Sequence, residues 1–405
     1  MLGPETCINE AGFRQTFPGK TLAIISDCVH FTLPNGRIAT ENHILLSQIK
    51  VLARHFSHTL ICCPFVDYDD HKIYTEYPGA FEFYPTPNVG GQSISDKMKI
   101  LRTIPVWLKT FKKINYKSDF IYLRFPNNLN IPGFFYFNNK HKPLFATYTG
   151  TWEKYRGEPR TYRLQKYLLK HFFKGPVFAY IKKENAKDHL HTTFSPSYSL
   201  EKWYEEIEPV ELKMKSLLEG GKKPFVFISV GAFNAMKNQQ FILDTFKTLN
   251  EKKIDYQLYL VGDGPLKKQY EQFLIKNHLT DRIIITGKLK ADELRILYRK
   301  ADFLIQASLV EGYGKVPVEG YFHGVVPFLY HTAMSEEILG AGKYGFEFEN
   351  LNPVSFAQYL LSKIEDQADI VNKLKAGRQY AKSLTLDQWS LEMIEVIKQY
   401  HDNKR

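Results

Sequence analysis

Two glutamates flank a glycine-rich turn in the second half of the chain, within residues 301–327 (ADFLIQASLVEGYGKVPVEGYFHGVVP). The glycines of the turn at 311–314 let the backbone bend tightly and leave amide N–H groups uncovered by side chains. A helix is expected to begin at Lys315, so its N-terminus and these amides would point at one place, which suits an anion or a hydroxyl-rich ligand. Glu311 lies in the turn and Glu319 about two helical turns later, so the amides would lie between two carboxylates.

The residues around this turn have the pattern of a strand, a loop, a helix and a second strand. Residues 301–306 form an apolar run of strand length. Pro317 falls in the first turn of the expected helix, where its missing N–H costs little. Gly324 is a typical helix end, and Val325 opens the next strand. The turn is therefore predicted to be held between a buried strand and a helix.

Strands and helices alternate in both halves of the chain, which predicts two doubly wound α/β domains in tandem, each with a parallel sheet. Strand character disappears between 196 and 223, so we expect the domains to be 1–195 and 196–384. In the first half we predict strands at 21–26, 59–66, 80–84, 120–124, 143–148 and 176–181, a loop at 27–40, and helices at 41–56, 94–111 and 162–173. In the second half we predict strands at 225–230, 257–261, 282–286 and 346–348, and helices at 239–250, 266–277, 292–299, 353–364, 370–382 and 386–400.

The charge of the chain is unevenly distributed. The net charge is +11, and residues 1–200 hold 26 Lys and Arg against 15 Asp and Glu. The excess of positive charge therefore lies in the first half. We expect an acidic partner for that half: anionic lipid, a phosphorylated substrate or nucleic acid.

The bulk composition is that of a soluble globular protein. No run of about 18 apolar residues predicts a transmembrane helix, and the start of the chain lacks the pattern of a secretory signal. The four cysteines form neither paired CxxC motifs nor a disulfide framework. These features favour a cytoplasmic protein.

Several motifs of the second half occur in the order seen in one enzyme family. Taken together, they make the second half resemble the donor domain of a GT-B glycosyltransferase of the retaining family 4, with two Rossmann-like domains facing a central cleft. The resemblance is strong over 225–350 and weak before 200. The motifs are Ser229-Val230-Gly231 with Lys237 downstream, the run YLVGDGP at 259–265, Asp281-Arg282-Ile283 leading to Thr286-Gly287, Ala301-Asp302, and the E-x7-E pair Glu311 and Glu319.

The resemblance implies a site for a nucleotide-diphospho-sugar donor. Glu319 would accept hydrogen bonds from the ribose, Glu311 would lie beside the sugar, and Lys237 would neutralise the pyrophosphate and stabilise the leaving group. Lys237 and Glu311 are thus the expected catalytic residues. It also implies that the last helix, within 385–405, returns to the first domain. The remaining donor-binding residues would be Gly264, Gly287, Leu289, Gly312, Tyr313, Gly314 and Lys315.

The chain departs from the family pattern in two places. Ala232 follows the Val-Gly turn where the family has a basic residue, most often Arg. Thr149 takes the position at a strand end where many members have a His. In the first domain Gly36 lies where the family has a Gly-Gly loop facing the donor phosphates, Arg37 could supply the missing cation, and Arg124 could meet an anionic acceptor. Gly36 could instead be part of a plain turn, and Arg124 could equally be structural.

Two further patterns suggest other ligands. Asp67-Tyr68-Asp69 spells the DxD metal motif of the GT-A class, but we interpret 67–70 as an acidic surface loop and expect neither a metal nor another cofactor. Segments 93–117 and 160–183 interleave Lys and Arg with large apolar residues, which suits helices lying on an anionic membrane. The alternative is ordinary core-facing helices with basic outer faces. No nucleic-acid motif occurs, so nucleic acid is not an expected partner.

These observations lead to one functional hypothesis and one alternative. The first is a metal-independent retaining hexosyltransferase that moves a sugar from a nucleotide-diphospho-sugar to a glycan or lipid-linked acceptor in cell-surface polysaccharide synthesis. We expect it in the cytoplasm, with peripheral attachment to the inner face of the membrane as an option. The alternative is a catalytically inactive GT-B-like partner or scaffold of a glycan-assembly complex. Such a role would account for Ala232 and Thr149 at positions where the family has Arg and His.

Overall fold

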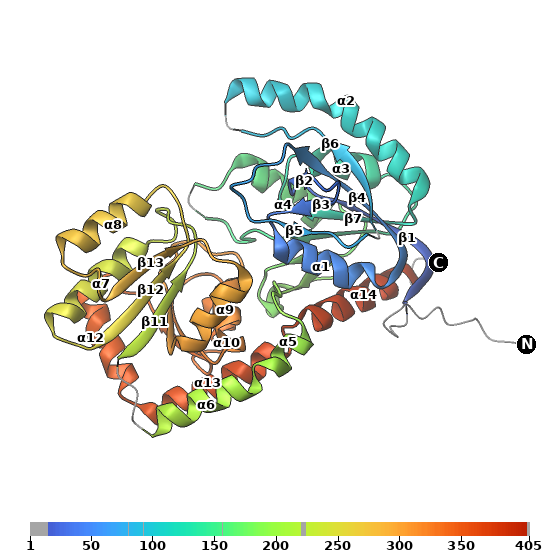
Figure 1. Cartoon of the computed structure of the whole chain (residues 1–405). Coiled ribbons are helices and arrows are strands. Elements are labelled where there is room, and N and C mark those ends of the chain that lie inside the picture. Colours follow the sequence, from blue (N-terminus) through green and yellow to red (C-terminus); the bar gives the residue numbers. More distant parts are fainter. Residues whose placement is uncertain (1–14, 80, 92, 156, 220–223, 403–405) are drawn as a thin grey trace, which may run out of the picture. The chain divides into compact units, whose positions relative to one another are not determined.

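The chain divides into two compact units, each with its own sheet and helices (Figure 1). Unit 1 comprises Met1–Pro196 and Leu386–Arg405, and unit 2 comprises Ser197–Thr385. The computed structural model describes residues 15–79, 81–91, 93–155, 157–219 and 224–402. The α/β class with two parallel-sheet units confirms the predicted fold class.

Unit 1 contains, among its described residues, a sheet of ten strands in the order β10-β9-β8-β7-β1-β4-β2-β3-β5, with β6 paired to β4. Its central strands are parallel, so their carboxyl ends share one edge. The strands are β1 (Phe17–Ile25), β2 (His30–Thr32), β3 (Ile38–Thr40), β4 (Phe56–Val66), β5 (Thr75–Glu76), β6 (Phe81–Thr86), β7 (Phe120–Phe125), β8 (Leu144–Tyr148), β9 (Val177–Ala179) and β10 (Leu190–Thr192).

Three helices of unit 1 cover the same face of its sheet. Alternate strand residues such as Ala23 and Ile25 of β1 point to one face, and they share a core with Trp107, Phe134 and Leu169 from three different helices. The last helix also belongs to unit 1, where Asp387 lies 3.9 Å from Arg54. The helices are α1 (His43–Ala53), α2 (Ile94–Lys117), α3 (Asn130–Phe137), α4 (Arg160–His171), the 3₁₀ helix Lys183–Asn185, and α14 (Leu386–Asp402).

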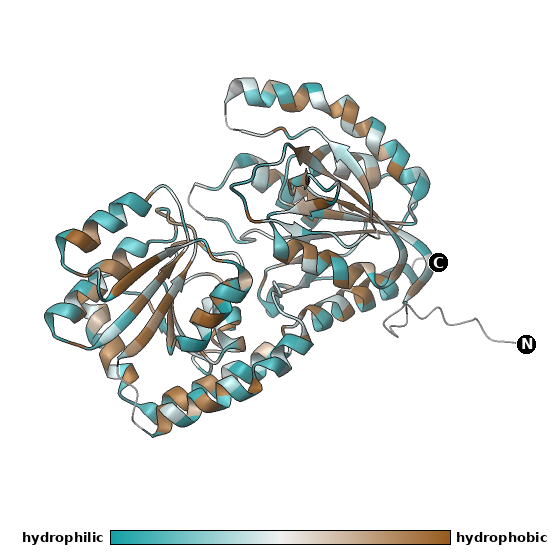
Figure 2. Ribbon diagram, viewed as in Figure 1, coloured by the Kyte–Doolittle hydropathy of each residue, from teal (hydrophilic) through white to brown (hydrophobic). Residues whose placement is uncertain are grey.

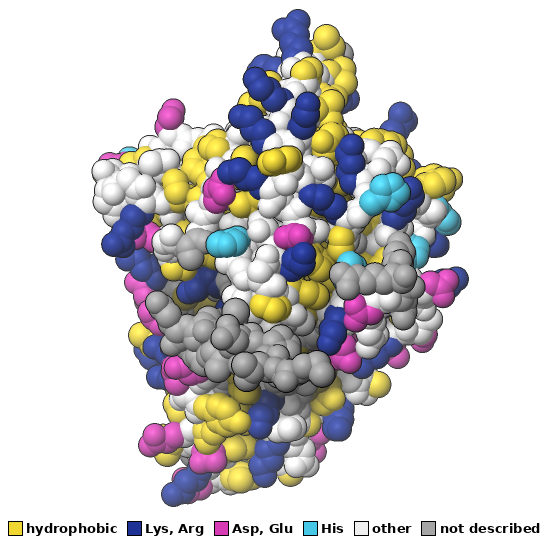
Figure 3. Space-filling model, turned by 90° about the vertical axis from the view of Figure 1, so that its right-hand side faces the viewer, with side chains coloured by type: hydrophobic (Ala, Val, Ile, Leu, Met, Phe, Trp, Pro, Cys, Tyr) yellow, Lys and Arg dark blue, Asp and Glu magenta, His cyan; other side chains and the backbone are white. Residues whose placement is uncertain are grey.

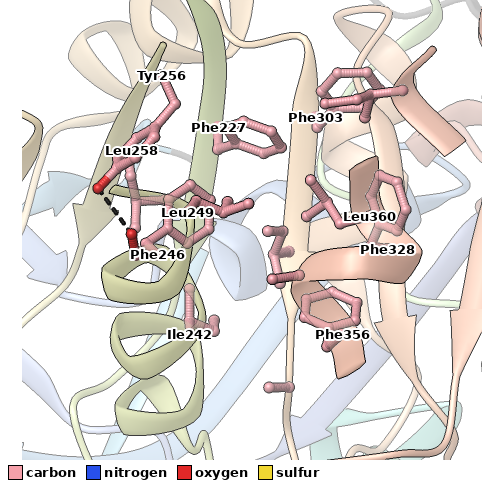
Figure 4. Close-up of a cluster of buried hydrophobic side chains, with 14 of the residues drawn as sticks. Phe227, Ile242, Phe246, Leu249, Tyr256, Leu258, Phe303, Phe328, Phe356 and Leu360 are labelled. Atoms are coloured by element: carbon pink, nitrogen blue, oxygen red, sulfur yellow. Dashed lines mark hydrogen bonds between the residues drawn. The ribbon is translucent and has the colours of Figure 1, made fainter. Parts of the chain in front are cut away.

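The described residues of unit 2 form a six-stranded parallel sheet in the order β13-β12-β11-β14-β15-β16. One face is filled by aromatic and aliphatic side chains, including Phe227, Phe246 and Phe328 (Figure 4). In this core the Tyr256 hydroxyl donates a hydrogen bond of 3.0 Å to the Phe246 carbonyl. The strands are β11 (Phe225–Val230), β12 (Tyr256–Val261), β13 (Ile283–Gly287), β14 (Phe303–Gln306), β15 (Val326–Tyr330) and β16 (Phe346–Phe348). The helices are α5 (Leu200–Glu205), α6 (Ile207–Leu218), α7 (Gln239–Glu251), α8 (Lys267–Lys276), α9 (Ala291–Lys300), α10 (Lys315–Phe322), α11 (Ser335–Ile338), α12 (Pro353–Ile364) and α13 (Gln367–Lys382).

Some of the predicted local structure is wrong. The expected loop at 27–40 contains the antiparallel hairpin β2–β3, and helix α3 was not foreseen. The helix expected at 41–56 covers only His43–Ala53, since Phe56 already opens β4. The stretch 196–223 contains α5 and α6, whose buried Trp203, Val210 and Leu217 recur every seven residues.

The distribution of hydropathy follows this architecture. Figure 2 shows hydrophobic residues concentrated in the strands of the unit 2 sheet, whereas the long helices alternate between hydrophobic and hydrophilic residues. In the described part of the chain, no helix combines the length and the apolarity needed to span a bilayer.

Candidate functional site

The two expected catalytic residues come from neighbouring strands at the centre of the unit 2 sheet. Lys237 lies between β11 and α7, and Glu311 lies between β14 and α10. The chain leaves β11 toward β12 and leaves β14 toward β15, so the direction of winding changes between these two strands. Ligands of open α/β sheets bind at such a switch point, outside the carboxyl ends of the strands.

Lys237 and Glu311 form an ion pair at this switch point. Lys237 Nζ lies 2.5 Å from Glu311 Oε2, and Gln306 Nε2 donates to the same oxygen at 3.1 Å. The side chains of Lys237 and Glu311 are 26% and 20% exposed, so both remain within reach of a ligand. The two loops are also joined by a backbone hydrogen bond of 2.8 Å from Leu309 N to Met236 O. The carboxylate therefore orients the ammonium group on a fixed loop.

The turn before α10 has the backbone that the sequence predicted. Gly314 adopts φ +82° and precedes the first residue of the helix, Lys315. A Cβ at Gly314 would also come within 3.0 Å of Ile338 Cδ1, so this position favours glycine on two grounds. Tyr313 is buried, whereas Gly312 and Lys315 are half-buried. The N–H groups at the start of α10 thus lie in the same loop as Glu311.

Glu319 is held by the protein rather than standing open to solvent. Only 8% of the residue is exposed. Ser197 Oγ donates to Glu319 Oε1 at 2.7 Å, and the Tyr298 hydroxyl donates to Oε2 at 3.1 Å. Neither Ser197 nor Tyr298 was among the residues selected from the sequence, because each lies far from Glu319 along the chain.

The glycines after β12 have a packing role. A Cβ at Gly262 would lie 2.0 Å from Gly231 O, and a Cβ at Gly264 would lie 2.5 Å from Phe233 O. The loops after β11 and β12 therefore approach each other too closely for side chains at these positions. Gly287, with φ +76°, meets nothing within 4 Å, and Leu289 is half-buried. Close packing alone is enough to require glycine at position 264. Beside Gly287 there is open space, which leaves room for a nucleotide-sugar donor.

The residues expected to assist from unit 1 lie on different elements. Gly36, with φ +78°, forms the turn of the β2–β3 hairpin, and Arg37 beside it pairs with Glu76 at 2.8 Å on the exposed surface. Arg124 Nη1 donates to the Tyr122 hydroxyl at 2.8 Å, near the end of β7. Thr149 follows β8, and its Oγ1 donates to Phe125 O at 3.1 Å. Arg124 and Thr149 thus share the carboxyl edge of the sheet, whereas Arg37 is already paired with a carboxylate.

Asp27 is a titratable group at this edge that the sequence analysis overlooked. It follows β1, the strand next to β7, and the chain also changes its winding direction between these strands. Asp27 keeps part of its surface exposed, yet desolvation by neighbouring atoms raises the pKa of its carboxyl group to about 6, while its own backbone and the charge of Arg124 act in the opposite direction. In the sequence, the feature that could have identified Asp27 is its position as a carboxylate just after a central strand.

The DxD loop gives a loose group of acidic atoms. Asp69, Asp70 and His71 each offer an atom within 4.8 Å of the others, and Asp70 and His71 are exposed. Asp69 Oδ1 accepts a hydrogen bond from His71 N at 3.0 Å, which shapes the turn. Exposed acidic groups of this kind are common without an ion.

Comparison with known proteins points to one family for unit 2. Residues 212–383 match the family model described as glycosyl transferases group 1. An uncharacterised glycosyltransferase of Methanocaldococcus jannaschii is 28% identical over 173 residues, 43% of this chain and 48% of that protein. The alpha-monoglucosyldiacylglycerol synthase of Streptococcus pneumoniae is 28% identical over 141 residues, 33% of this chain and 31% of that protein. The chain thus spans half or less of the length of these relatives.

Solved structures match almost the whole chain in fold. Sucrose-phosphate synthase from Thermosynechococcus elongatus superposes with a TM-score of 0.69 at 16% identity, over 95% of this chain and 100% of that one. Anabaena HepE in complex with UDP and glucose gives a TM-score of 0.65 at 14% identity, over 93% of this chain and 99% of that one. At such identities the likeness concerns the fold, and it includes both units.

Proposed function

Since residues 212–383 form a glycosyl transferases group 1 domain in a chain of GT-B fold, we propose that the protein is a retaining glycosyltransferase that takes a hexose from a nucleotide-diphospho-sugar. One observation carries this proposal. The Lys237–Glu311 ion pair stands at the switch point of the unit 2 sheet, in the loops next to the N-terminus of α10. A cation and the N-terminus of a helix at one place suit a diphosphate leaving group.

Each proposed role follows from the chemistry of the transferred group. As the bond between the anomeric carbon and the phosphate oxygen breaks, negative charge grows on the diphosphate. Lys237 and the amides of 312–315 stabilise that charge, and Glu311 keeps the ammonium in place. The acceptor oxygen then bonds to the anomeric carbon on the same face, and its proton passes to the departing phosphate. With Ala232 following Gly231, this loop offers one cation fewer than the family pattern.

The acceptor in this proposal is a glycan or a lipid-linked acceptor. Two relatives support it: the Streptococcus pneumoniae relative is an alpha-monoglucosyldiacylglycerol synthase, and a Campylobacter jejuni protein, 23% identical over 64% of this chain, acts on a diphospho-undecaprenol-linked sugar. The complex of HepE with UDP and glucose supports a nucleotide-sugar donor. The basic charge of residues 1–200 fits an acceptor that carries phosphate.

The proposal is tested by turnover with a panel of nucleotide-sugars. We expect the purified protein to release free nucleotide from one donor of a panel of UDP-, GDP- and ADP-hexoses, with a bacterial membrane extract as the source of acceptor. Because Lys237 and the helix N-terminus supply the positive charge, EDTA should leave the rate unchanged. A heat-inactivated sample is the control. Absence of both binding and turnover with every donor would overturn the proposal.

The alternative is a GT-B-like partner that binds a nucleotide-sugar without using it. Ala232 and Thr149 favour it, because each replaces a side chain that the family pattern places at the reacting groups. The same panel separates the two functions when donor binding is measured by calorimetry beside turnover. Tight binding of one donor with no release of nucleotide in the presence of acceptor extract would favour the scaffold.

We also propose that the protein attaches peripherally to the cytoplasmic face of an anionic membrane through unit 1. Helices α2, α3 and α4 share one face of the sheet, and their outer sides carry large exposed apolar residues beside lysines and arginines. Figure 3 shows such a mixture of hydrophobic and basic side chains on a projecting part of the molecule. The exposed apolar residues are Met98, Leu101, Val106, Leu108 and Tyr116 of α2, Phe135 of α3, Leu164 and Tyr167 of α4, and Phe172.

Charge reversal on α2 should weaken membrane binding. We expect the Lys112→Glu, Lys113→Glu double variant to sediment at least about tenfold less with vesicles rich in phosphatidylglycerol, because each cation near such a surface contributes about 1 kcal/mol. Binding of the unmodified protein should fall as salt rises from low to physiological concentration. The matched control is Lys268→Glu, Lys276→Glu on the exposed side of α8 in unit 2. Binding that ignores lipid charge and salt would contradict this attachment.

A further inference from the structure

Both oxygens of the Glu319 carboxylate are engaged by hydroxyl groups from distant parts of unit 2. Ser197 Oγ donates a hydrogen bond to one oxygen at 2.7 Å, and the Tyr298 hydroxyl donates to the other at 3.1 Å. A glutamate side chain has several rotatable bonds, so two donors, one on each oxygen, fix the plane of the carboxylate. Each oxygen still has a second lone pair for another donor.

Tyr298 is itself firmly held. It is fully buried on α9, and its ring stacks on His323 with centroids 5.3 Å apart and an angle of 13° between the planes. His323 Nδ1 lies 3.1 Å from Glu206 Oε2. The next residue of α9, Arg299, donates to both oxygens of Glu206, at 2.9 and 2.7 Å. The Tyr298 hydroxyl is therefore positioned by a buried polar network and has little freedom to follow Glu319.

Ser197, which donates the other hydrogen bond to Glu319, lies at the boundary between the two units along the chain. It is the first residue of unit 2 and directly follows Pro196, the last residue of this part of unit 1. The carboxylate of α10 is thus tied to the segment where the chain passes from one unit to the other. Any ligand that contacts Glu319 would share the carboxylate with this segment.

We propose that Tyr298 and Ser197 are positioning residues that hold the Glu319 carboxylate for the two neighbouring hydroxyl groups of a ribose. This inference rests on the proposed donor site. The remaining lone pair of each oxygen can accept one hydroxyl hydrogen, so a carboxylate fixed in plane matches a vicinal diol. Loosening either protein hydrogen bond should weaken the contact with ribose more than the contact with the rest of the nucleotide.

The test compares ribonucleotides with their 2′-deoxy counterparts by calorimetry. UDP, GDP and ADP are the probes, and the tightest of them is then measured against its 2′-deoxy form. We expect the unmodified protein to prefer the ribonucleotide by about tenfold or more, since hydrogen bonds to a charged group are the stronger kind. Tyr298→Phe and Ser197→Ala should each reduce this preference to about threefold or less.

The matched control is Tyr256→Phe, which also removes a buried hydroxyl that donates to one acceptor, the Phe246 carbonyl. A general loss of stability would affect this variant as much as Tyr298→Phe, but its preference for ribose should stay as in the unmodified protein. Ser197 is only half-buried, so Ser197→Ala decides the question if Tyr298→Phe fails to fold. An unchanged preference in the folded variants would overturn the positioning role.

Failure of this inference differs from failure of the donor site. If Glu319→Ala leaves the affinity for every probe unchanged, Glu319 contacts no nucleotide and the donor site itself is wrong. If Glu319→Ala abolishes the preference for ribose while Ser197→Ala and Tyr298→Phe preserve it, the donor site stands and only the positioning role falls.

Discussion

Replacing Glu319 by alanine should weaken nucleotide binding by about 100-fold. Two hydrogen bonds from ribose hydroxyls to a carboxylate contribute about 1.5–3 kcal/mol each. Glu319→Gln keeps the shape and should still lose roughly tenfold, because a neutral amide has a single acceptor oxygen. The measurement is calorimetric titration with the nucleotide that binds the unmodified protein best.

Glu319→Ala also leaves the hydroxyl groups of Ser197 and Tyr298 without their acceptor. Tyr298 is fully buried, so its unsatisfied hydroxyl should cost about 1–3 kcal/mol of folding stability. Thermal unfolding of each variant must therefore accompany the titration, so that loss of binding is separated from loss of fold. Glu271→Ala, at an exposed position of α8, is the control and should change neither quantity. A folded Glu319→Ala protein with full nucleotide affinity would contradict the assignment.

Replacing Lys237 by methionine should lower kcat by about 10²–10³, the usual effect of removing one group that stabilises developing charge. Methionine keeps most of the length and apolar volume of lysine but removes the ammonium. The KM for the donor should change less, because the diphosphate carries its extra charge only as the bond breaks. Steady-state release of nucleotide from the accepted donor measures both constants.

The ion pair with Glu311 allows a sharper version of this test. Glu311→Gln should also lower kcat, and the double variant with Lys237→Met should be hardly slower than Lys237→Met alone, because the carboxylate acts by holding the ammonium. Lys247→Met removes a lysine from an exposed pair with Glu251 and serves as the control. Additive losses in the double variant would show that Glu311 has a role of its own beside the sugar.

Much of unit 2 could be predicted because its signals are local. The apolar run before Glu311, the glycines of the turn and the proline in the first helical turn each act over a few residues. The observed β14, the φ of +82° at Gly314 and the start of α10 at Lys315 follow from these constraints. The β2–β3 hairpin was missed because strands of three residues carry almost no pattern and are defined by their pairing.

Contacts between distant residues were beyond the reach of pattern analysis. No sequence pattern singles out Ser197 or Tyr298, since hydroxyl residues are frequent and neither stands in a motif. Asp27 was passed over although it follows a strand, because a raised pKa depends on the atoms packed around the carboxyl group. The resemblance implies a donor-binding role for Gly264, and only the fold reveals that the loop at Phe233 also presses against it.

By itself the sequence determined the alternation of strands and helices, the glycine-rich turn and the order of motifs, which together define the fold and the type of unit 2. The tertiary structure decided how the functional side chains meet. It brings Lys237 into contact with Glu311, 74 residues further along the chain, and Ser197 into contact with Glu319, 122 residues further along. The reason is physical: backbone geometry is set by neighbours in sequence, whereas a side chain's hydrogen-bond partner is set by which strands lie side by side in the sheet.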